Sequence, residues 1–536
     1  MDVLNVVKDD NRIMFHLLLL KKIKKLWEKN MGQLKKIDKK TKYIHIGIIL
    51  LGIVFICLSA FHEDIWFDES YSVAIAKHSF SEIWNITGND VHPPLYYWML
   101  HIVWMIFGNQ NIAFRLFSVL AIAILGILGY THIRKDFGEK VGMLFSFLVY
   151  FLPVMCTYSQ EIRMYSWSCL IVTILAIYGY RLYKNIKEKT TLKEQNKNLV
   201  IFGIFSIAAC YIHYYALAAA GLINFMILVY LIKNRKENTK LLRNFIILAV
   251  IQIILYIPWL LYLKGQVAHV ESGFWIELEY STLIEVLSFQ FRRQLDTEFT
   301  FDAHTIIALI AALAMYIYIG YRIYRTKKEK GILFPGVLSI VTYILVILAV
   351  LMISFKIPIL YARYLIVITG LYIFGLAFFM AKEKRKWVIG SVCAIILILG
   401  IISNVTNMTI NYDNSNMKQI EYLRENVQPD DILIYSNIGN GGVIAAFFPD
   451  NKQYFYNGEF WDVEEAYKAY GPGMEIIYNY DDILNDYHGR IWLIDSENCE
   501  LYNSFPKEGM QTIVEPTQFR TKYQNYVYTF VLLEKE

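Results

Sequence analysis

The sequence predicts an α-helical polytopic membrane protein with a small soluble α/β domain at its C-terminal end. Of the 536 residues, 56% are hydrophobic, which is more than a soluble protein of this size usually carries. The apolar residues form runs of roughly 20, the helix length that crosses a bilayer core of about 30 Å. Lys and Arg cluster in the stretches between these runs, as they do in cytoplasmic loops.

Eleven apolar segments are predicted as membrane spans. They are residues 43–61, 112–133, 141–157, 164–183, 199–212, 214–232, 244–263, 303–323, 332–354, 361–381 and 387–403. A further segment, residues 93–107, is apolar but short, and its length alone leaves open whether it crosses or lies at the interface. If it does not cross, every basic loop falls on the side of the Lys-rich N-terminus, as the positive-inside rule requires. We therefore predict an interfacial helix there.

This topology divides the chain into three parts. Residues 1–42 are predicted to be a basic cytoplasmic lead without the cleavage site of a signal peptide. Residues 43–403 form the membrane bundle. Residues 404–536 fall on the outer side and show the alternating helix-like and strand-like patterns of a small α/β domain. The expected location is the plasma membrane, crossed several times, with a cytoplasmic N-terminus and an extracytoplasmic C-terminal domain.

Charge and cysteine content exclude some classes of function. The net charge is only +5 and the basic residues lie in separate loops, so nucleic acid is not an expected partner. The six cysteines show neither the spacing of a metal site nor that of a disulfide framework.

An adjacent acidic pair, Asp68 and Glu69, lies where the chain leaves the first predicted span. Ionisable groups near lipid are expensive to hold, so they suggest function. A carboxylate in a partly dehydrated site can remove a proton from an acceptor hydroxyl, which makes this pair a candidate catalytic group. The alternative is that Asp68 caps the following helix, with Glu69 in its first turn.

A second acidic site, with Glu161 and Arg163, lies in a very short loop that the topology places on the same face. The two residues can form a structural ion pair that caps helix ends. Together with Asp68, Glu161 can instead hold a divalent cation, Mg²⁺ or Mn²⁺, or the two acids can divide into a base and an orienting group.

Basic and aromatic residues on this face are candidates for substrate contacts. His92 precedes two prolines and either stabilises a rigid turn or contacts a phosphate. Arg363 opens a late span and either reaches the headgroups or binds a phosphate with its planar fork. The candidates for sugar, lipid or acceptor contacts are Tyr71, Tyr165, His213 and Tyr364, although interfacial aromatic belts and interhelical hydrogen bonds explain such residues too.

Four motifs in this order resemble those of a known superfamily. They are FDESYS (67–72), HPPLYYW (92–98), the pattern FG-x-x-x-x-A-x-R-L-x-S (107–118) and SQEIRMY (159–165). Over about the first 380 residues the chain resembles the GT-C membrane glycosyltransferases, specifically the bacterial family 39 type. That type is similar to protein O-mannosyltransferases and to the lipid A aminoarabinose transferase.

The resemblance implies a helical bundle with interfacial helices in its first outer loop. It also implies transfer of a sugar from a polyprenyl-phosphate carrier to an acceptor hydroxyl at the outer face. Asp68 and Glu161 match the two acidic positions, although several relatives have Asp at the second. His92 stands where the aminoarabinose transferase has a lysine that contacts the carrier phosphate, and Arg363 with Tyr364 matches a late Arg-Tyr element. The departing phosphate would be stabilised by Arg163, His92, Arg363 or a divalent cation.

Two other functions compete with this one. A transporter or flippase for lipid-linked saccharides predicts charged residues in the middle of spans, whereas the polar groups here gather at one face. A binding module led by the C-terminal domain predicts that Asp68→Asn and Glu161→Gln leave function intact. The acceptor, whether protein, lipid or wall glycopolymer, stays open.

Overall fold

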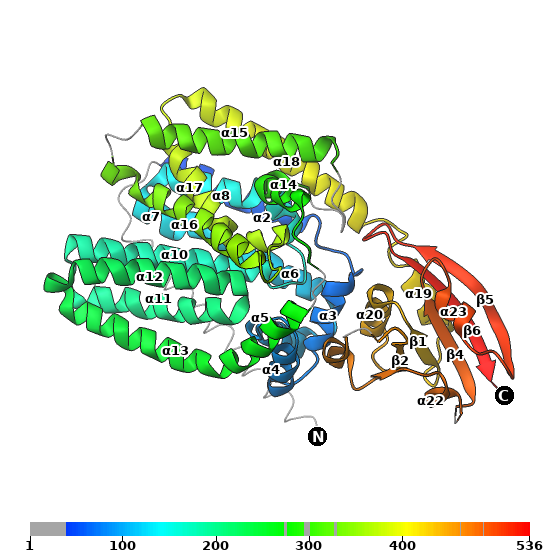
Figure 1. Cartoon of the computed structure of the whole chain (residues 1–536). Helices are drawn as coiled ribbons and strands as arrows, with labels where there is room; N and C mark the ends of the chain where they lie inside the picture. Colours follow the sequence, from blue (N-terminus) through cyan, green and yellow to red (C-terminus); the bar gives the residue numbers. More distant parts are fainter. Residues whose placement is uncertain are drawn as a thin grey trace, which may run out of the picture.

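The computed structural model describes residues 39–272, 276–293, 301–325, 330–460, 463–485 and 487–535. They form a helical bundle with a sheet domain packed against one of its ends (Figure 1). Most of the predicted cytoplasmic lead, residues 1–38, lies outside the described residues.

The bundle contains long helices, short interfacial helices and single turns. Its elements are α2 (Lys39–Cys57), α3 (Phe67–Ile75), α4 (Phe80–Asn89), α5 (Leu95–Phe107), α6 (Asn111–Leu128), η1 (Gly129–Ile133), α7 (Arg134–Phe137), α8 (Glu139–Phe151), α9 (Pro153–Tyr158), α10 (Tyr165–Glu188), α11 (Leu192–Ile212), α12 (Tyr214–Lys233), α13 (Arg235–Ser272), α14 (Tyr280–Ser288), η2 (Phe289–Phe291), α15 (Ala303–Arg325), α16 (Lys330–Ser354), η4 (Ala362–Ile368), α17 (Thr369–Ala381) and α18 (Lys386–Asn411).

Among the described residues, 8 helices are long and apolar enough to cross a membrane. All eleven predicted spans lie in helices, but three of them do not meet this measure, so eleven is higher than the number found. α8 has only 13 residues because the chain turns to an extended conformation at Leu152, before Pro153 begins α9. α10 and α11 are long enough, but their polar ends lower their apolarity.

The loop between α2 and α6 contains the short helices α3, α4 and α5. α5 has 13 residues and is about 20 Å long at 1.5 Å per residue, which is too short to cross a core of roughly 30 Å. α4 begins with a capping box, in which Ser79 and Glu82 each bind the other's backbone N–H. α3 begins in a similar way, because the Glu69 carboxylate accepts the backbone N–H of Trp66 at 3.4 Å.

The last membrane helix, α18, runs to Asn411 and so extends beyond residue 403, where the apolar run was predicted to end. Its polar residues continue the helix because their amides bind neighbouring backbone carbonyls. Asn404 Nδ2 donates to Phe55 O at 2.8 Å, and Asn411 Nδ2 donates to Ser59 O at 2.9 Å. The end of α18 is thereby fixed to the end of α2.

The C-terminal domain is an α/β sheet. Its elements are α19 (Lys418–Asn426), β1 (Ile432–Tyr435), α20 (Ile438–Phe447), β2 (Lys452–Tyr456), α21 (Glu464–Tyr467), η5 (Lys468–Tyr470), β3 (Met474–Ile477), α22 (Asp481–Leu484), β4 (Gly489–Asp495), α23 (Glu500–Ser504), β5 (Met510–Arg520) and β6 (Val527–Lys535). The strand order is β3-β2-β1-β4-β6-β5. The first four strands are parallel, and β6 and β5 are added as an antiparallel hairpin.

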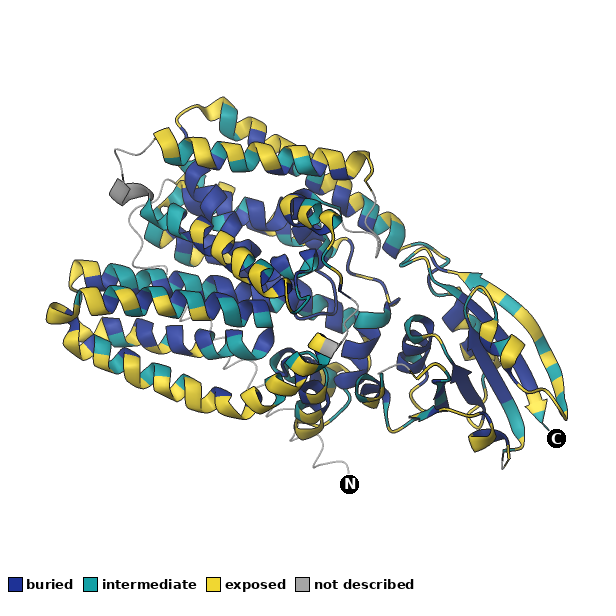
Figure 2. Ribbon diagram, viewed as in Figure 1, coloured by how far each residue is buried: buried dark blue, intermediate teal, exposed yellow. Residues whose placement is uncertain are grey.

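The two faces of this sheet belong to different cores. Ile432 and Ile434 of β1 face a small core that the domain closes with its own side chains. Leu433 and Tyr435, on the other face, belong to the large core that continues into the membrane bundle. Figure 2 shows the result as buried residues on both sides of the junction, whereas outer helices such as α13 and α15 are largely exposed.

An apolar cavity of about 360 Å³ lies between α10, α12, α16 and α17. Its lining includes Tyr183 and Lys233, which lie toward the ends of α10 and α12. Tyr165 and Tyr214 begin those same helices at the sheet-domain side. The cavity therefore lies away from the acidic loops.

Candidate active site

Glu69 connects the two acidic loops. Its carboxylate is fully buried and forms a two-pronged ion pair with Arg115 of α6, with Oε1 to Nη1 at 2.6 Å and Oε2 to Nη2 at 2.9 Å. Oε1 also accepts the backbone N–H of Ile162 at 2.9 Å. Because Ile162 follows Glu161, this one carboxylate fixes the second loop against the first.

Asp68 points away from this buried pair. Its Oδ2 lies 3.1 Å from Arg363 Nη1, and its side chain keeps 19% of its surface exposed. The Arg363 guanidinium also lies over the rings of Trp66 and Tyr361, at 5.2 and 4.8 Å from their centroids. Asp68 is therefore held by a cation but still open to a small molecule.

Arg163 is a buried cation with an incomplete set of partners. Its Nη1 donates to Asp68 O at 3.0 Å and to Ser72 Oγ at 3.3 Å, while Nη2 donates to His92 Nε2 at 3.1 Å. It forms no ion pair with a carboxylate of the described residues, and its Nε finds no acceptor among them. Arg163 is only 3% exposed, so this cation is buried without a carboxylate of the described chain in direct contact.

His92 orients Arg163. A guanidinium has no acceptor, so His92 Nε2 must accept and Nδ1 must carry the proton. Nδ1 then donates to Asp90 Oδ2 at 2.9 Å, and Tyr71 OH donates to the same oxygen at 2.7 Å. The chain Tyr71–Asp90–His92–Arg163 fixes the direction of the guanidinium.

Glu161 lies among these charges. Burial and the neighbouring Glu69 carboxylate raise the pKa of Glu161 to about 8, although Arg363 and Arg163 act in the opposite direction. Its backbone carbonyl accepts a hydrogen bond from Ser118 Oγ at 2.6 Å, which fixes the loop. At neutral pH this carboxyl is therefore mostly protonated.

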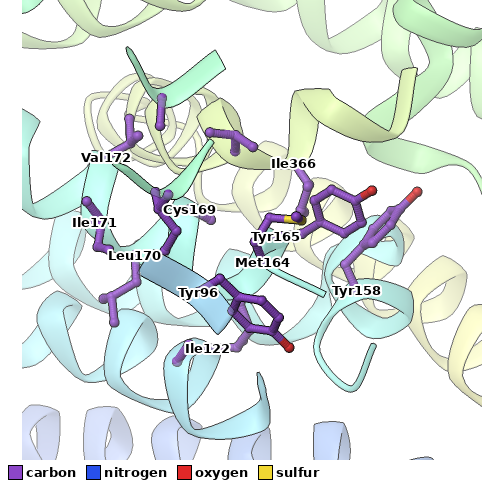
Figure 3. Close-up of a cluster of buried hydrophobic side chains, with 14 of the residues drawn as sticks. Tyr96, Ile122, Tyr158, Met164, Tyr165, Cys169, Leu170, Ile171, Val172 and Ile366 are labelled. Atoms are coloured by element: carbon purple, nitrogen blue, oxygen red, sulfur yellow. The ribbon is translucent and has the colours of Figure 1, made fainter. Parts of the chain in front are cut away.

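Aromatic side chains form one wall of the site. The rings of Tyr158 and Tyr165 meet edge to face with centroids 5.6 Å apart, and Figure 3 shows their hydroxyl groups on the same side. The Tyr165 hydroxyl is buried and has no partner among the described residues. His213 and Tyr364 extend this wall, with ring centroids 5.1 Å apart. Burial, with His92 and Arg163 nearby, lowers the pKa of His213 to about 3, so this ring is neutral.

The structure changes the roles expected for three residues. Glu69 was predicted to be catalytic, but its carboxylate has no exposed surface. Its oxygens already accept hydrogen bonds from Arg115 and from the backbone of Ile162, so it cannot touch a substrate. His92 was predicted to bind phosphate, but both of its ring nitrogens are engaged by Asp90 and Arg163. Tyr71 was expected at the acceptor, but its hydroxyl is bound to Asp90.

The predicted cation site has few ligands. No group of three or more His, Cys, Asp or Glu side chains that could hold a metal ion occurs in the described part of the chain. Asp68 and Glu161 would supply two protein ligands, and Asp68 is already paired with Arg363. A divalent cation held by Asp68 and Glu161 therefore stays a prediction.

Sequence reasoning did not assign a role to Arg115 or to Tyr523. Arg115 is a charged residue inside an apolar helix, and that signal marks it as a partner for a buried acid. Tyr523 lies in the C-terminal domain, and its hydroxyl donates to Glu69 Oε2 at 3.2 Å. No local pattern distinguishes it from the other 39 of the 40 tyrosines.

Comparison with protein families gives one partial match. Residues 91–262 match the family model described as dolichyl-phosphate-mannose-protein mannosyltransferase. This stretch contains His92, Arg115, Glu161 and Arg163, but it is less than half of the chain. No curated protein matches the sequence.

Solved structures resemble almost the whole chain. ArnT from Cupriavidus metallidurans in the apo state aligns with a TM-score of 0.64 and 11% identity, covering 92% of this chain and 98% of that one. The chain has a GT-C fold. ArnT bound to undecaprenyl phosphate aligns with a TM-score of 0.58 and 10% identity, covering 91% and 97% of the two chains.

The likeness to another solved complex is weaker. The protein O-mannosyltransferase complex Pmt1–Pmt2 of S. cerevisiae, bound to its sugar donor, aligns with a TM-score of 0.34 and 18% identity, over 45% of this chain and 36% of that one. That likeness is too low to support an argument. The GT-C fold predicted from the motifs is thus confirmed by the ArnT alignments, and with the apolar helices it makes the chain a multi-pass membrane protein.

Proposed function

We propose that the protein is a glycosyltransferase that moves a sugar from a polyprenyl-phosphate carrier to an acceptor hydroxyl at the outer face of the membrane. The GT-C fold and the partial family match support transfer of a glycosyl group. The similar ArnT structure contains undecaprenyl phosphate, which supports a carrier of that class.

The observation that carries the proposal is the incomplete set of partners around the buried Arg163. A buried cation without a counter-ion is strongly unfavourable unless an anion completes the site. The partnerless Nε of Arg163 and hydroxyl of Tyr165 are donors of the kind that a phosphate oxygen accepts. The loop position at the end of the bundle suits a carrier whose phosphate stands at the surface while its tail lies in lipid.

In this proposal Asp68 is the base. Its carboxylate takes the proton of the acceptor hydroxyl as the oxygen attacks the anomeric carbon of the sugar. The bond between that carbon and the carrier oxygen breaks, and the electron pair leaves with the phosphate. Arg163 stabilises the charge that develops on the phosphate, and His92 and Asp90 keep it in place.

Glu161 contributes by being neutral. Because its pKa is raised to about 8, the carboxyl is mostly protonated at pH 7 and does not repel the carrier phosphate. An ionised carboxylate at this position would oppose the charge of Arg163. A requirement for a divalent cation stays a prediction, and no step above uses one.

The topology and the acceptor are part of the proposal. The site would face outward, with the N-terminus in the cytoplasm and the sheet domain outside the cell, as the positive-inside rule indicates. The acceptor is a hydroxyl of a protein, a lipid or a wall glycopolymer. The rival function, transport of lipid-linked saccharides, receives no support from the position of the charges at one end of the bundle.

The test uses the purified full-length protein with a panel of polyprenyl-phosphate sugars. Mass spectrometry should detect released carrier phosphate together with a glycosylated acceptor. In parallel, the protein is placed in vesicles that contain the same donors. Movement of intact donors across the vesicle membrane, without release of carrier phosphate from any of them, would favour the flippase and contradict the transferase. Adding EDTA in the transfer assay decides whether a divalent cation is required.

A further inference from the structure

The C-terminal domain meets the membrane bundle at the helix that carries Asp68. The hydroxyls of Tyr470 and Ser70 lie 2.8 Å apart. Gly442 packs so closely on Phe67 that a Cβ atom there would lie 2.9 Å from its ring, so only glycine allows this approach. Figure 1 shows α20, which contains Gly442, beside α3. The domain therefore rests directly on the acidic loop.

The tip of the β5–β6 hairpin reaches further, to Glu69. The hydroxyl of Tyr523 donates to Glu69 Oε2 at 3.2 Å. Its backbone N–H donates to Asn416 Oδ1 at 2.8 Å, just beyond the end of α18. The next two residues, Gln524 and Asn525, have φ of 58° and 53°, a left-handed conformation that is unfavourable for glutamine in particular. The contacts of Tyr523 on both sides hold the tip in this shape.

The acceptor of this hydrogen bond is the group that positions both candidate acids. Glu69 directly follows Asp68 on α3. It also holds the N–H of Ile162, the residue after Glu161. A donor from the C-terminal domain thus acts on the carboxylate that links the two loops.

We propose that Tyr523 is a positioning residue for sugar transfer, acting through Glu69, and that the docked C-terminal domain completes the active site. This inference rests on the proposed transferase function. The C-terminal domain would thus contribute to sugar transfer through Tyr523. The Tyr523 hydroxyl orients the carboxylate that orders Asp68 and Glu161, while Asp68 acts on the substrate.

The test is Tyr523→Phe in the full-length protein, which removes one hydroxyl and keeps the ring. We expect kcat to fall about tenfold, the change that corresponds to losing one hydrogen bond to a charged group. KM for the donor should stay within about twofold because the phosphate-binding Arg163 is untouched. The matched control is Tyr478→Phe. The Tyr478 hydroxyl, like that of Tyr523, donates to a carboxylate, but its acceptor Glu464 lies at the surface of the C-terminal domain. It should behave like the wild type.

Hydrogen exchange gives a readout that does not need the reaction. In Tyr523→Phe the backbone N–H groups of residues 66–72 and 159–164 should exchange faster than in Tyr478→Phe, with the thermal midpoint unchanged. Wild-type kcat together with wild-type exchange would overturn the inference, as would a loss of activity that only follows the folded fraction. If the wild type transfers none of the donors, the proposed function fails, and the exchange experiment still decides whether Tyr523 positions the loops.

Discussion

Two buried charges at opposite ends of the bundle are held in different ways. At the end away from the sheet domain, Glu383 accepts hydrogen bonds from Arg385 at 3.1 and 3.2 Å and from Arg322 at 3.3 Å. These bonds from Arg385, with Arg322 nearby, lower the pKa of Glu383 to about 2. At the sheet-domain end, Arg163 has no such counter-ion. We interpret the ion-paired Glu383 as a structural residue. We interpret Arg163, which contacts no carboxylate in the described part of the chain, as a residue that binds an anionic ligand.

The largest effect is expected at the base. Asp68→Asn keeps the shape of the side chain but removes the proton acceptor, so transfer should fall by about 10³-fold, within the usual range for a general base. The measurement is the rate of carrier-phosphate release at saturating donor. A variant that keeps more than a tenth of wild-type turnover would remove Asp68 from the mechanism.

The second largest effect is expected at Arg163, at the sheet-domain end of the bundle. Arg163→Gln should lower transfer about 10²-fold because the departing phosphate loses its charge partner. The same change should leave the thermal midpoint unchanged or raise it, since an unpaired buried cation destabilises the fold without its ligand. The control is Arg520→Gln, because Arg520 forms an ion pair with Glu497 at the surface. This variant should match the wild type in both transfer and thermal midpoint. A drop in stability without a drop in transfer would mean that Arg163 is structural.

At the opposite end of the bundle, a substitution at Glu383 should lower stability and leave sugar transfer nearly unchanged. Glu383→Gln should change transfer by less than about twofold but lower stability by about 1 kcal/mol, the size of a hydrogen-bonded ion pair partly open to water. The folded pKa of Glu383 is below its usual value of 4.5, so its contribution is present above pH 4.5 and is lost as the pH falls toward about 2. Thermal melts across that range, wild type against variant, measure it.

A smaller effect concerns pH and Glu161. Its carboxyl ionises as the pH rises through about 8, so transfer should fall about twofold at pH 8 and about tenfold at pH 9 relative to pH 6.5. Glu161→Gln should keep most of the neutral-pH activity and lose this alkaline decline. Because the folded pKa is raised above 4.5, the stability contribution of this group is full below pH 4.5 and is lost as the pH rises to about 8. An unchanged pH profile in the variant would exclude Glu161 as the titrating group.

Sequence reasoning found the helices and the acidic loops because both leave local signals. Apolar runs predict helices, and charges at the ends of such runs predict sites. It did not find the break at Leu152, since the residues on both sides are apolar. It also missed β5, an exposed edge strand, because Pro516 within the segment argues against a strand.

The roles of individual site residues required tertiary structure. Asp68 and Glu69 are neighbours in the sequence with the same chemistry, but one faces an open site and the other is buried against Arg115. The partners that separate them are 46 and 454 residues away from Glu69, at Arg115 and Tyr523. No spacing rule in a single sequence links positions so far apart.

One hydrophobic core runs from the bundle into one face of the sheet. The C-terminal domain therefore cannot simply be replaced by that of another protein. A chimera made by cutting after Asn411 and attaching the tail of a relative would remove Leu433 and Tyr435 from the shared core and leave Glu69 without Tyr523. Grafting a new tail therefore calls for matching substitutions along α3. In such a protein the membrane half and the outer half cannot be exchanged independently of each other.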